Sequence, residues 1–388
     1  MALATADVPG ALADATEHQP GARAALAAAL LAPAHAYLLA GPPGSGKRAA
    51  ARAFVAELLA GDAPEPDDVR RRALADPSPH PDLVWLAPQG TQHLVDEVRE
   101  RVIVAAVYRP FEGARRAFVI EAAEAMADES QNALLKTLEE PPPFAHLVLI
   151  TSEPAALLET VRSRCQAVRF APLTEEAVDL RLAELGLGQD GEQRRAGARL
   201  SGGDTDRAAF LLGDQGRELR AAAQACVAAA LTGELAGAPW QGVLSAAEAA
   251  GDQAAEAAQA RFEGLAAEAG EGKTRGARRR SRETEEAIRR AARRARTEAL
   301  DLGLALMAAW LRDLAAVAEG AEDLVWNCDR LEALRAASAQ ADRGLDARRA
   351  RVGAELVMDT RRRLRVNVGE ELALEALVFR LEALLRDA

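Results

Sequence analysis

A chain of 388 residues with 49% hydrophobic and 28% charged residues has the composition of a globular protein and is too long to fold around one hydrophobic core. Its formal net charge of −11 argues against a protein that binds nucleic acid over its whole surface. The three cysteines, Cys165, Cys226 and Cys328, exclude a disulfide framework and lack metal-ligand spacing. The sequence shows neither a signal peptide nor an apolar run that could cross a bilayer, which predicts a cytoplasmic protein without membrane contact.

The first ~170 residues alternate short apolar runs with helical patterns, which is typical of a parallel α/β sheet. Strands are predicted for five of these runs, at residues 36–40, 83–86, 117–120, 146–151 and 167–170. Helices are predicted at 48–59, 92–107, 128–138 and 155–161, and residues 61–82 are interpreted as a Pro-rich loop. The fold class predicted for this part of the chain is therefore α/β.

Helical patterns dominate the rest of the chain. Thr174 has the position of a helix cap, and it opens a helical stretch that runs to residue 212. From residue 214 the pattern stays helical to the end, apart from Gly and Pro breaks near 237–240. We therefore predict three domains: an α/β domain at 1–172, a small helical domain at 173–213 and an all-helical domain at 214–388.

The most basic part of the chain lies within an Ala-, Arg- and Glu-rich segment at 251–297. Residues 273–296 carry eleven basic and three acidic side chains, a local charge of +8, so the rest of the chain carries about −19. The pairs Glu285/Arg289 and Glu286/Arg290 are four residues apart in the favourable orientation, which predicts a long exposed helix. A nucleic-acid-binding patch is the alternative interpretation of the same charge.

A glycine-rich loop, Gly-Pro-Pro-Gly-Ser-Gly-Lys, follows the first predicted strand and precedes a predicted helix. This is the context of a phosphate-binding loop, in which glycines let backbone N–H groups approach phosphate oxygens and the lysine adds a cation. The next residue should be Ser or Thr, whose hydroxyl coordinates Mg²⁺, but it is arginine here. ATP or ADP is the predicted ligand, and the predicted contacts from this loop are Gly41, Gly44, Ser45, Gly46, Lys47 and Arg48.

An acidic residue, Glu121, stands at the end of the third predicted strand. In a phosphate-loop protein this is the place of the carboxylate that holds Mg²⁺. An active hydrolase carries a second carboxylate directly afterwards, and Ala122 stands there in this chain. Arg48 and Ala122 together predict poor hydrolysis. The alternative interpretation of Glu121 is an exposed charge at a strand end.

Two further strings are specific. Residues 132–142 read Asn-Ala-Leu-Leu-Lys-Thr-Leu-Glu-Glu-Pro-Pro, and residues 163–166 read Ser-Arg-Cys-Gln. Spaced in this way after a phosphate loop, they resemble the AAA+ clamp-loader subunits of bacterial DNA polymerase III, the family of the gamma/tau and delta-prime subunits. The resemblance covers residues about 17 to 212 and is weaker beyond them. It implies an AAA+ domain, a helical lid domain at 173–213 and a helical collar domain at 214–388.

The resemblance also implies roles for single residues. Arg164 would be an arginine finger that acts on ATP bound to the neighbouring subunit. Thr151 and Ser152 match the sensor 1 region, and Arg207, which follows Ser-Gly-Gly, matches sensor 2. For the two sensor regions, a helix-cap or surface role is the alternative. The family's four-cysteine zinc module would fall in 61–82, which contains no cysteine, so no zinc is expected.

Within the family, Arg48 and Ala122 favour the delta-prime type, which braces the complex and completes a neighbour's ATP site. The implied partners are the gamma/tau and delta subunits and, through the complex, the sliding clamp and primed DNA. The main alternative is an active gamma/tau-type ATPase that Arg48 merely slows. A phosphate-loop kinase, from a different class of enzyme, is the third hypothesis, but such an enzyme needs no Ser-Arg-Cys finger.

Overall fold

The computed structural model describes residues 8–88, 92–268, 277–340, 346–364 and 369–386. The chain divides into two compact units, Met1–Leu173 and Thr174–Ala388. The further boundary between residues 213 and 214 stays a prediction.

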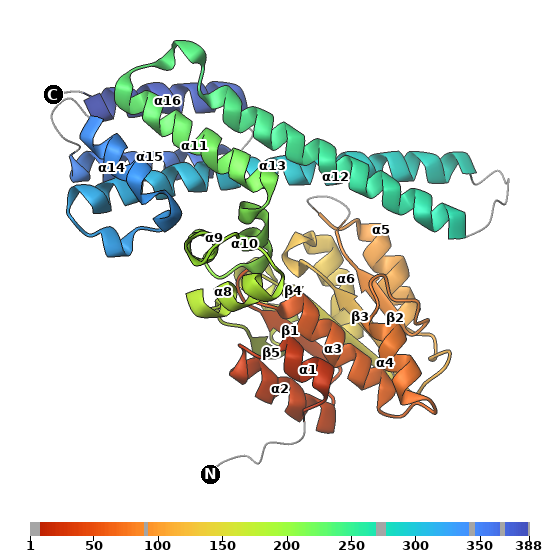
Figure 1. The fold of residues 1–388 in the computed structure, drawn as a ribbon. Coiled ribbons are helices and arrows are strands. Elements are labelled where there is room, and N and C mark those ends of the chain that lie inside the picture. The colour runs from red at the N-terminus through yellow and green to blue at the C-terminus, as the bar shows by residue number, and fades with distance from the viewer. Residues whose placement is uncertain (1–7, 89–91, 269–276, 341–345, 365–368, 387–388) are drawn as a thin grey trace. The chain divides into compact units, whose positions relative to one another are not determined.

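The first unit is built on a parallel five-stranded sheet with the strand order β2-β3-β4-β1-β5 (Figure 1). Every neighbouring pair is parallel, and Ala40 at the end of β1 pairs with Thr151 at the end of β4. The carboxyl ends of β3, β4 and β1 therefore meet at one edge of the sheet. The strands are β1 Ala36–Ala40, β2 Leu83–Leu86, β3 Arg116–Ile120, β4 Ala145–Thr151 and β5 Gln166–Arg169. The predicted α/β fold class is confirmed.

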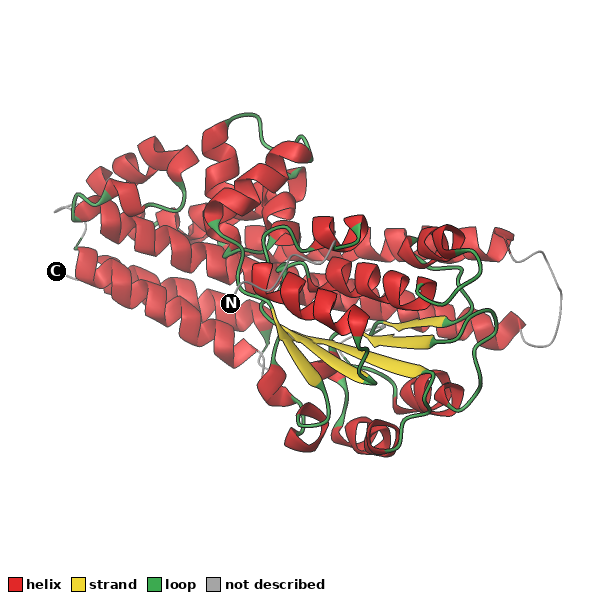
Figure 2. Cartoon of the chain, turned by 90° about the horizontal axis from the view of Figure 1, so that it is seen from below, coloured by secondary structure: helices red, strands yellow, loops and turns green. Residues whose placement is uncertain are grey.

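Helices cover both faces of this sheet, as Figure 2 shows for the yellow strands and the red helices around them. Because strand side chains alternate between faces, Tyr37 and Leu39 of β1 enter one hydrophobic cluster and Leu38 enters another. The first cluster also contains Phe54 of α3, and the second contains Leu134 of α6. The helices of this unit are α1 Gly10–Ala15, α2 Pro20–Leu31, α3 Lys47–Ala60, α4 Pro66–Leu74, α5 Val95–Val98, the π-helical η1 Arg99–Val104, the 3-10 turns η2 Ala123–Ala125 and η3 Pro154–Ala156, α6 Asp128–Glu139 and α7 Glu159–Arg162.

Three helices of this unit, α1, α2 and α4, were not predicted. The segment interpreted as a Pro-rich loop contains α4, which begins at Pro66. Its first turn carries Asp67 and Asp68, and its last turn carries Arg71 and Arg72. Proline at the start, acids at the N-terminal end and bases at the C-terminal end all favour a helix, so the sequence held this signal.

The prediction of one continuous helix at 155–161 was wrong. The structure has two short helices there, η3 and α7, with Leu157 and Leu158 extended between them. The backbone N–H of Leu158 donates to the side-chain oxygen of Gln131 at 2.8 Å instead of to a helical carbonyl. Leu157 is buried in the core. A contact from α6, distant in sequence, therefore divides the segment.

Helices are the only regular secondary structure in the described residues of the second unit, as predicted. Its core is formed by residues such as Leu219, Val243, Met307, Val357 and Leu381, all buried. The helices are α8 Glu175–Glu184, α9 Gly191–Ser201, α10 Thr205–Leu212, α11 Asp214–Thr232, α12 Trp240–Glu268, α13 Ala277–Ala318, α14 Leu331–Gln340, α15 Ala347–Leu364 and α16 Glu370–Arg386, with 3-10 turns η4 Leu235–Gly237, η5 Glu322–Leu324 and η6 Cys328–Arg330.

The exposed helix predicted from charge spacing is present in α13, where the Glu285/Arg289 and Glu286/Arg290 pairs both have N···O distances of 3.5 Å. The start of the basic segment, at 273–276, lies outside the described residues. Across all the described parts of the chain, no helix combines the length and the hydropathy needed to cross a membrane.

Candidate nucleotide site

The glycine loop connects β1 to α3, the strand–loop–helix arrangement that the sequence predicted. Gly44 and Gly46 have φ values of 66° and 86°, a region that L side chains rarely adopt. A Cβ atom on Gly41 would lie 2.4 Å from the carbonyl oxygen of Phe170, so the chain needs glycine there for a different reason. The loop thus requires its glycines both for backbone turns and for close packing against the chain after β5.

Lys47 places its ammonium group inside this loop. The residue is only 6% exposed. Its Nζ donates to the carbonyl oxygens of Gly41 at 2.7 Å and Pro42 at 2.5 Å, and it lies 3.4 Å from Ser45 Oγ. Ser45 Oγ donates to the same Pro42 carbonyl at 2.8 Å. A cation is therefore fixed at the centre of the loop, beside the N-terminus of α3, where an anion is favoured.

The next residue, Arg48, pairs with the strand-end carboxylate of Glu121. The distance from Arg48 Nε to Glu121 Oε2 is 3.3 Å, and Trp85 Nε1 donates to the same oxygen at 3.0 Å. Arg48 also reaches Asp76 at 2.9 Å. Arg52, one turn further along α3, lies 3.1 Å from the other oxygen of Asp76 and 4.3 Å from the centroid of the Trp85 ring. We call these five residues the Arg48 cluster.

The Mg²⁺ ion that phosphate loops use with their nucleotide takes oxygen ligands. Arg48 offers only N–H donors, and Glu121 Oε2 already accepts a hydrogen bond from Trp85 and forms an ion pair with Arg48. The cluster also balances two guanidinium groups against two carboxylates, so it has no excess negative charge to attract a divalent cation. The residues at these positions do not fit Mg²⁺.

Ala122 adopts a left-handed backbone conformation with a φ of 50°. Its methyl group cannot polarise a water molecule. The nearest following acid, Glu124, uses Oε1 to accept the backbone N–H of Ser152 at 3.1 Å. Thr151 is buried, and its hydroxyl accepts the backbone N–H of Glu153 at 3.1 Å. Because Gly41 N donates to Thr151 O at 3.2 Å, the predicted sensor 1 region does lie directly beside the loop.

Arg164 lies just after α7 and contacts residues outside the loop and the Arg48 cluster. Its Nη2 is 2.5 Å from Glu139 Oε1 at the end of α6, and its Nη1 donates to the carbonyl of Thr160 at 2.9 Å. The arginine side chain is 34% exposed. Burial raises the pKa of the neighbouring Cys165 to about 12, which favours the neutral thiol, and this side chain packs against the hydrophobic cluster that contains Leu134.

Arg207 belongs to the second unit, where it lies on α10. Its backbone N–H donates to the capping side chain of Asp204 at 3.0 Å. The family role of this arginine at a nucleotide stays a prediction.

Sequence reasoning missed four residues that organise these groups: Asp76, Trp85 and Arg52 around Arg48, and Glu139 beside Arg164. Arg52 follows Arg48 by one helical turn, which is a readable signal once α3 is assigned. Asp76 follows α4 and Trp85 lies on β2, so both come close to Arg48 only when the sheet and the turn after α4 have formed. No local pattern could have found them.

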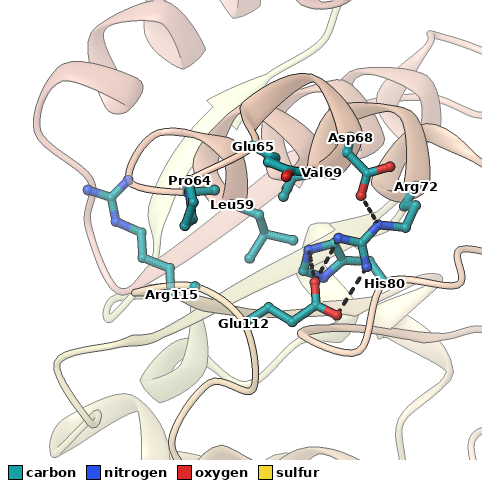
Figure 3. Close-up of a pocket in the computed structure, with 11 residues that line it drawn as sticks. Leu59, Pro64, Glu65, Asp68, Val69, Arg72, His80, Glu112 and Arg115 are labelled. Carbon is teal, nitrogen blue, oxygen red and sulfur yellow. Dashed lines mark hydrogen bonds and ion pairs between the residues drawn. The ribbon is translucent and has the colours of Figure 1, made fainter.

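The segment where the family's zinc module would fall instead forms part of a pocket between α4 and the chain before β3 (Figure 3). The Glu112 carboxylate faces both Arg72 and His80 there, and Arg72 pairs with both Asp68 and Glu112 at 2.7 Å. His80 Nε2 is 4.0 Å from Glu112 Oε2. Within the described residues no group of three His, Cys, Asp or Glu side chains could hold a metal ion. The charges of this pocket are thus largely balanced within the chain.

Three buried histidines of the first unit make its stability depend on pH. His80, His93 and His146 are at most 4% exposed, and burial lowers the pKa of each below its ordinary value. The unfolded chain takes up protons near pH 6.5 and the folded chain resists them, so stability is full above pH 6.5 and falls below it. The loss is at most about 1.4 kcal/mol per pH unit for each histidine.

Urea midpoints measured from pH 7.5 to 5.5 check this expectation. Carboxylates titrate below this window, so a falling midpoint here reports the histidines. A midpoint that stays constant down to pH 5.5 would contradict it.

Comparisons with known proteins agree with the resemblance seen in the motifs. Residues 27–174 match the family described as DNA polymerase III, delta subunit. The chain is 38% identical over 195 residues to DNA polymerase III subunit delta' of Pseudomonas aeruginosa, covering 48% of this chain and 58% of that protein. It is 31% identical over 146 residues to DNA polymerase III subunit tau of Bacillus subtilis, covering 37% of this chain and 26% of that one.

Among solved structures, a DNA polymerase III gamma subunit-related protein of Thermotoga maritima aligns with 93% of this chain and 99% of its own length, at 14% identity and a TM-score of 0.37. The chain spans little more than half the length of the Pseudomonas relative it matches. The N-terminal part of the chain is thus similar in sequence to the delta' and tau subunits of DNA polymerase III.

Proposed function

We propose that this chain is a delta-prime-type subunit of a bacterial DNA polymerase III clamp loader. In this role it works in the cytoplasm with gamma/tau and delta subunits to load a sliding clamp onto primed DNA. It contributes the arginine finger Arg164 to a neighbour's ATP site and hydrolyses little or no ATP itself. The relationship of residues 27–174 to delta subunits supports the assignment of the complex.

The observation that carries the accessory role is the ion pair between Arg48 and Glu121. It joins the two positions that would bind Mg²⁺, and Ala122 removes the acid that would activate water. The glycines of the loop and Lys47, in contrast, match the phosphate-loop pattern. The arrangement keeps the anion-binding loop and lacks the groups for hydrolysis, which supports a subunit that acts on a neighbour's ATP and not on its own.

Reconstitution tests this function. The chain is mixed with gamma/tau and delta from the same organism, and assembly is followed by light scattering while clamp loading is followed on primed DNA. We expect a stable complex, and we expect loading to fall to background when this chain is left out. Loading that proceeds equally well without it would contradict the proposal.

The alternative, an active gamma/tau-type ATPase, is favoured by the complete loop from Gly41 to Lys47 and by the similarity to a tau subunit. A measurement on the isolated chain separates the two functions. Steady-state ATP turnover by the isolated chain should stay near the buffer rate if it is an accessory subunit, because both the metal ligand and the second acid are missing. Robust Mg²⁺-dependent turnover would establish the alternative.

A further inference from the structure

The Arg48 cluster does more than remove a metal ligand: it brings a protein cation to the place beside the loop where the metal would act. Arg48 follows Lys47 directly at the start of α3. Its guanidinium is held from two sides, by Glu121 at 3.3 Å and by Asp76 at 2.9 Å. Trp85 in turn fixes Glu121 through its indole N–H at 3.0 Å.

The cluster orients the Arg48 side chain and also leaves it accessible to a ligand from solvent. Its side chain is 54% exposed, whereas that of Arg52 is 11% exposed. Asp76 is shared between the two arginines, so Arg52 satisfies part of its charge. An arginine presents five N–H donors in a planar fork that matches phosphate oxygens. The two carboxylate contacts leave part of this fork open to solvent.

The loop itself keeps everything that attracts a phosphate group without a metal. Lys47 supplies a buried ammonium group, and the N-terminus of α3 supplies backbone N–H groups and the positive end of the helix dipole. Arg48 adds a second cation. A polyphosphate would meet the Lys47 ammonium group, the N-terminus of α3 and the exposed N–H donors of Arg48, whose charge is shared with Glu121 and Asp76.

We propose that this site binds a nucleoside diphosphate or triphosphate without Mg²⁺, with the Arg48 guanidinium in place of the ion. Glu121 and Asp76 are positioning residues for Arg48 and not metal ligands. The inference deepens the proposed function, since it rests on the loop being the nucleotide site of an accessory subunit. A nucleotide bound in this way is a stable structural ligand, because the residues at this site do not bind the Mg²⁺ ion that would promote its hydrolysis.

Calorimetric titration of the full-length chain with ADP tests the proposal, once in Mg²⁺ and once in EDTA. For the unchanged protein the two dissociation constants should agree within about twofold. Arg48→Ser removes the guanidinium, restores a hydroxyl ligand and frees Glu121, so binding in EDTA should become at least about tenfold weaker than in Mg²⁺. Lys47→Ala should abolish binding in both buffers, which places the signal in the loop.

Arg48→Lys keeps a cation and should retain binding that is insensitive to Mg²⁺, so it provides a second variant if Arg48→Ser does not fold. ADP binding by the unchanged chain that requires Mg²⁺ overturns the proposal, and so does the absence of binding in both buffers. Clamp loading by the reconstituted complex is expected with either result of this titration. Failure of this inference is therefore distinguishable from failure of the proposed function.

Discussion

Replacing Arg164 by alanine is expected to leave the reconstituted clamp loader assembled and to reduce ATP hydrolysis at the neighbouring site by about 10³-fold or more. An arginine finger stabilises the charge that develops on a γ-phosphate, and alanine cannot do this. The intramolecular partner of Arg164 is Glu139, whose side chain is 49% exposed, so losing the pair should cost the fold little. DNA-stimulated ATP turnover and clamp loading by the complex are the measurements.

Two further variants make this test specific. Arg162→Ala removes an exposed arginine from α7 two residues earlier and should leave turnover unchanged. Arg164→Lys keeps the charge but loses the planar fork, and it should recover only a small part of the activity. Clamp loading by Arg164→Ala at the normal rate would rule out the finger. So would an equal loss in Arg162→Ala, because the effect would then follow charge and not position.

The features that sequence predicted well are those that local chemistry determines. The strand, glycine loop and helix around Lys47 are adjacent along the chain, and their residue types permit few other arrangements. Glu121 was placed correctly because a strand end is a local feature. Its ion pair with Arg48 was not foreseen, since it requires β3 to lie within reach of α3 and depends on Trp85 from a third element.

The same distinction applies to Arg164. Its exposure after a short helix follows from the local sequence, but its ion pair with Glu139 joins positions 25 residues apart. Such contacts depend on how α6 and α7 pack against the sheet, and hydrophobic periodicity does not record that packing. The roles predicted at a partner's nucleotide are harder still to derive from this sequence, because they depend on contacts with another chain.

The second large effect is expected in the helical unit, where Arg220→Ala should lower the free energy of unfolding by about 3–5 kcal/mol. The Arg220 side chain is 3% exposed and forms two hydrogen bonds with Asp329, at 2.7 and 3.0 Å. Its Nη2 also donates to Asn327 Oδ1 at 3.1 Å. Alanine would leave the carboxylate of Asp329, itself only 11% exposed, without its countercharge.

The cost should be large because the pair belongs to a connected network. Asp313 of α13 is fully buried, and its Oδ2 accepts the backbone N–H and the side-chain N–H of Asn327, both at 2.8 Å. Asn327 in turn accepts from Arg220 of α11. The segment before α14 is thus fixed between two helices by polar groups that have little access to water. Removing one member leaves its buried partners unsatisfied.

Urea unfolding measures the loss, and hydrogen exchange followed by mass spectrometry locates it. Peptides from α11 and from residues 325–330 should lose protection, while peptides from the sheet unit serve as the internal reference. Arg335→Ala is the matched control, since Arg335 makes a comparable two-bond pair with Glu322 but is 54% exposed, and its midpoint should hardly move. A double variant, Arg220→Met with Asp329→Leu, should regain most of the stability, because the penalty comes from the stranded charge. If Arg220→Ala matched Arg335→Ala, the network would contribute no more than a surface ion pair, and burial of the guanidinium would not be what holds this segment in place.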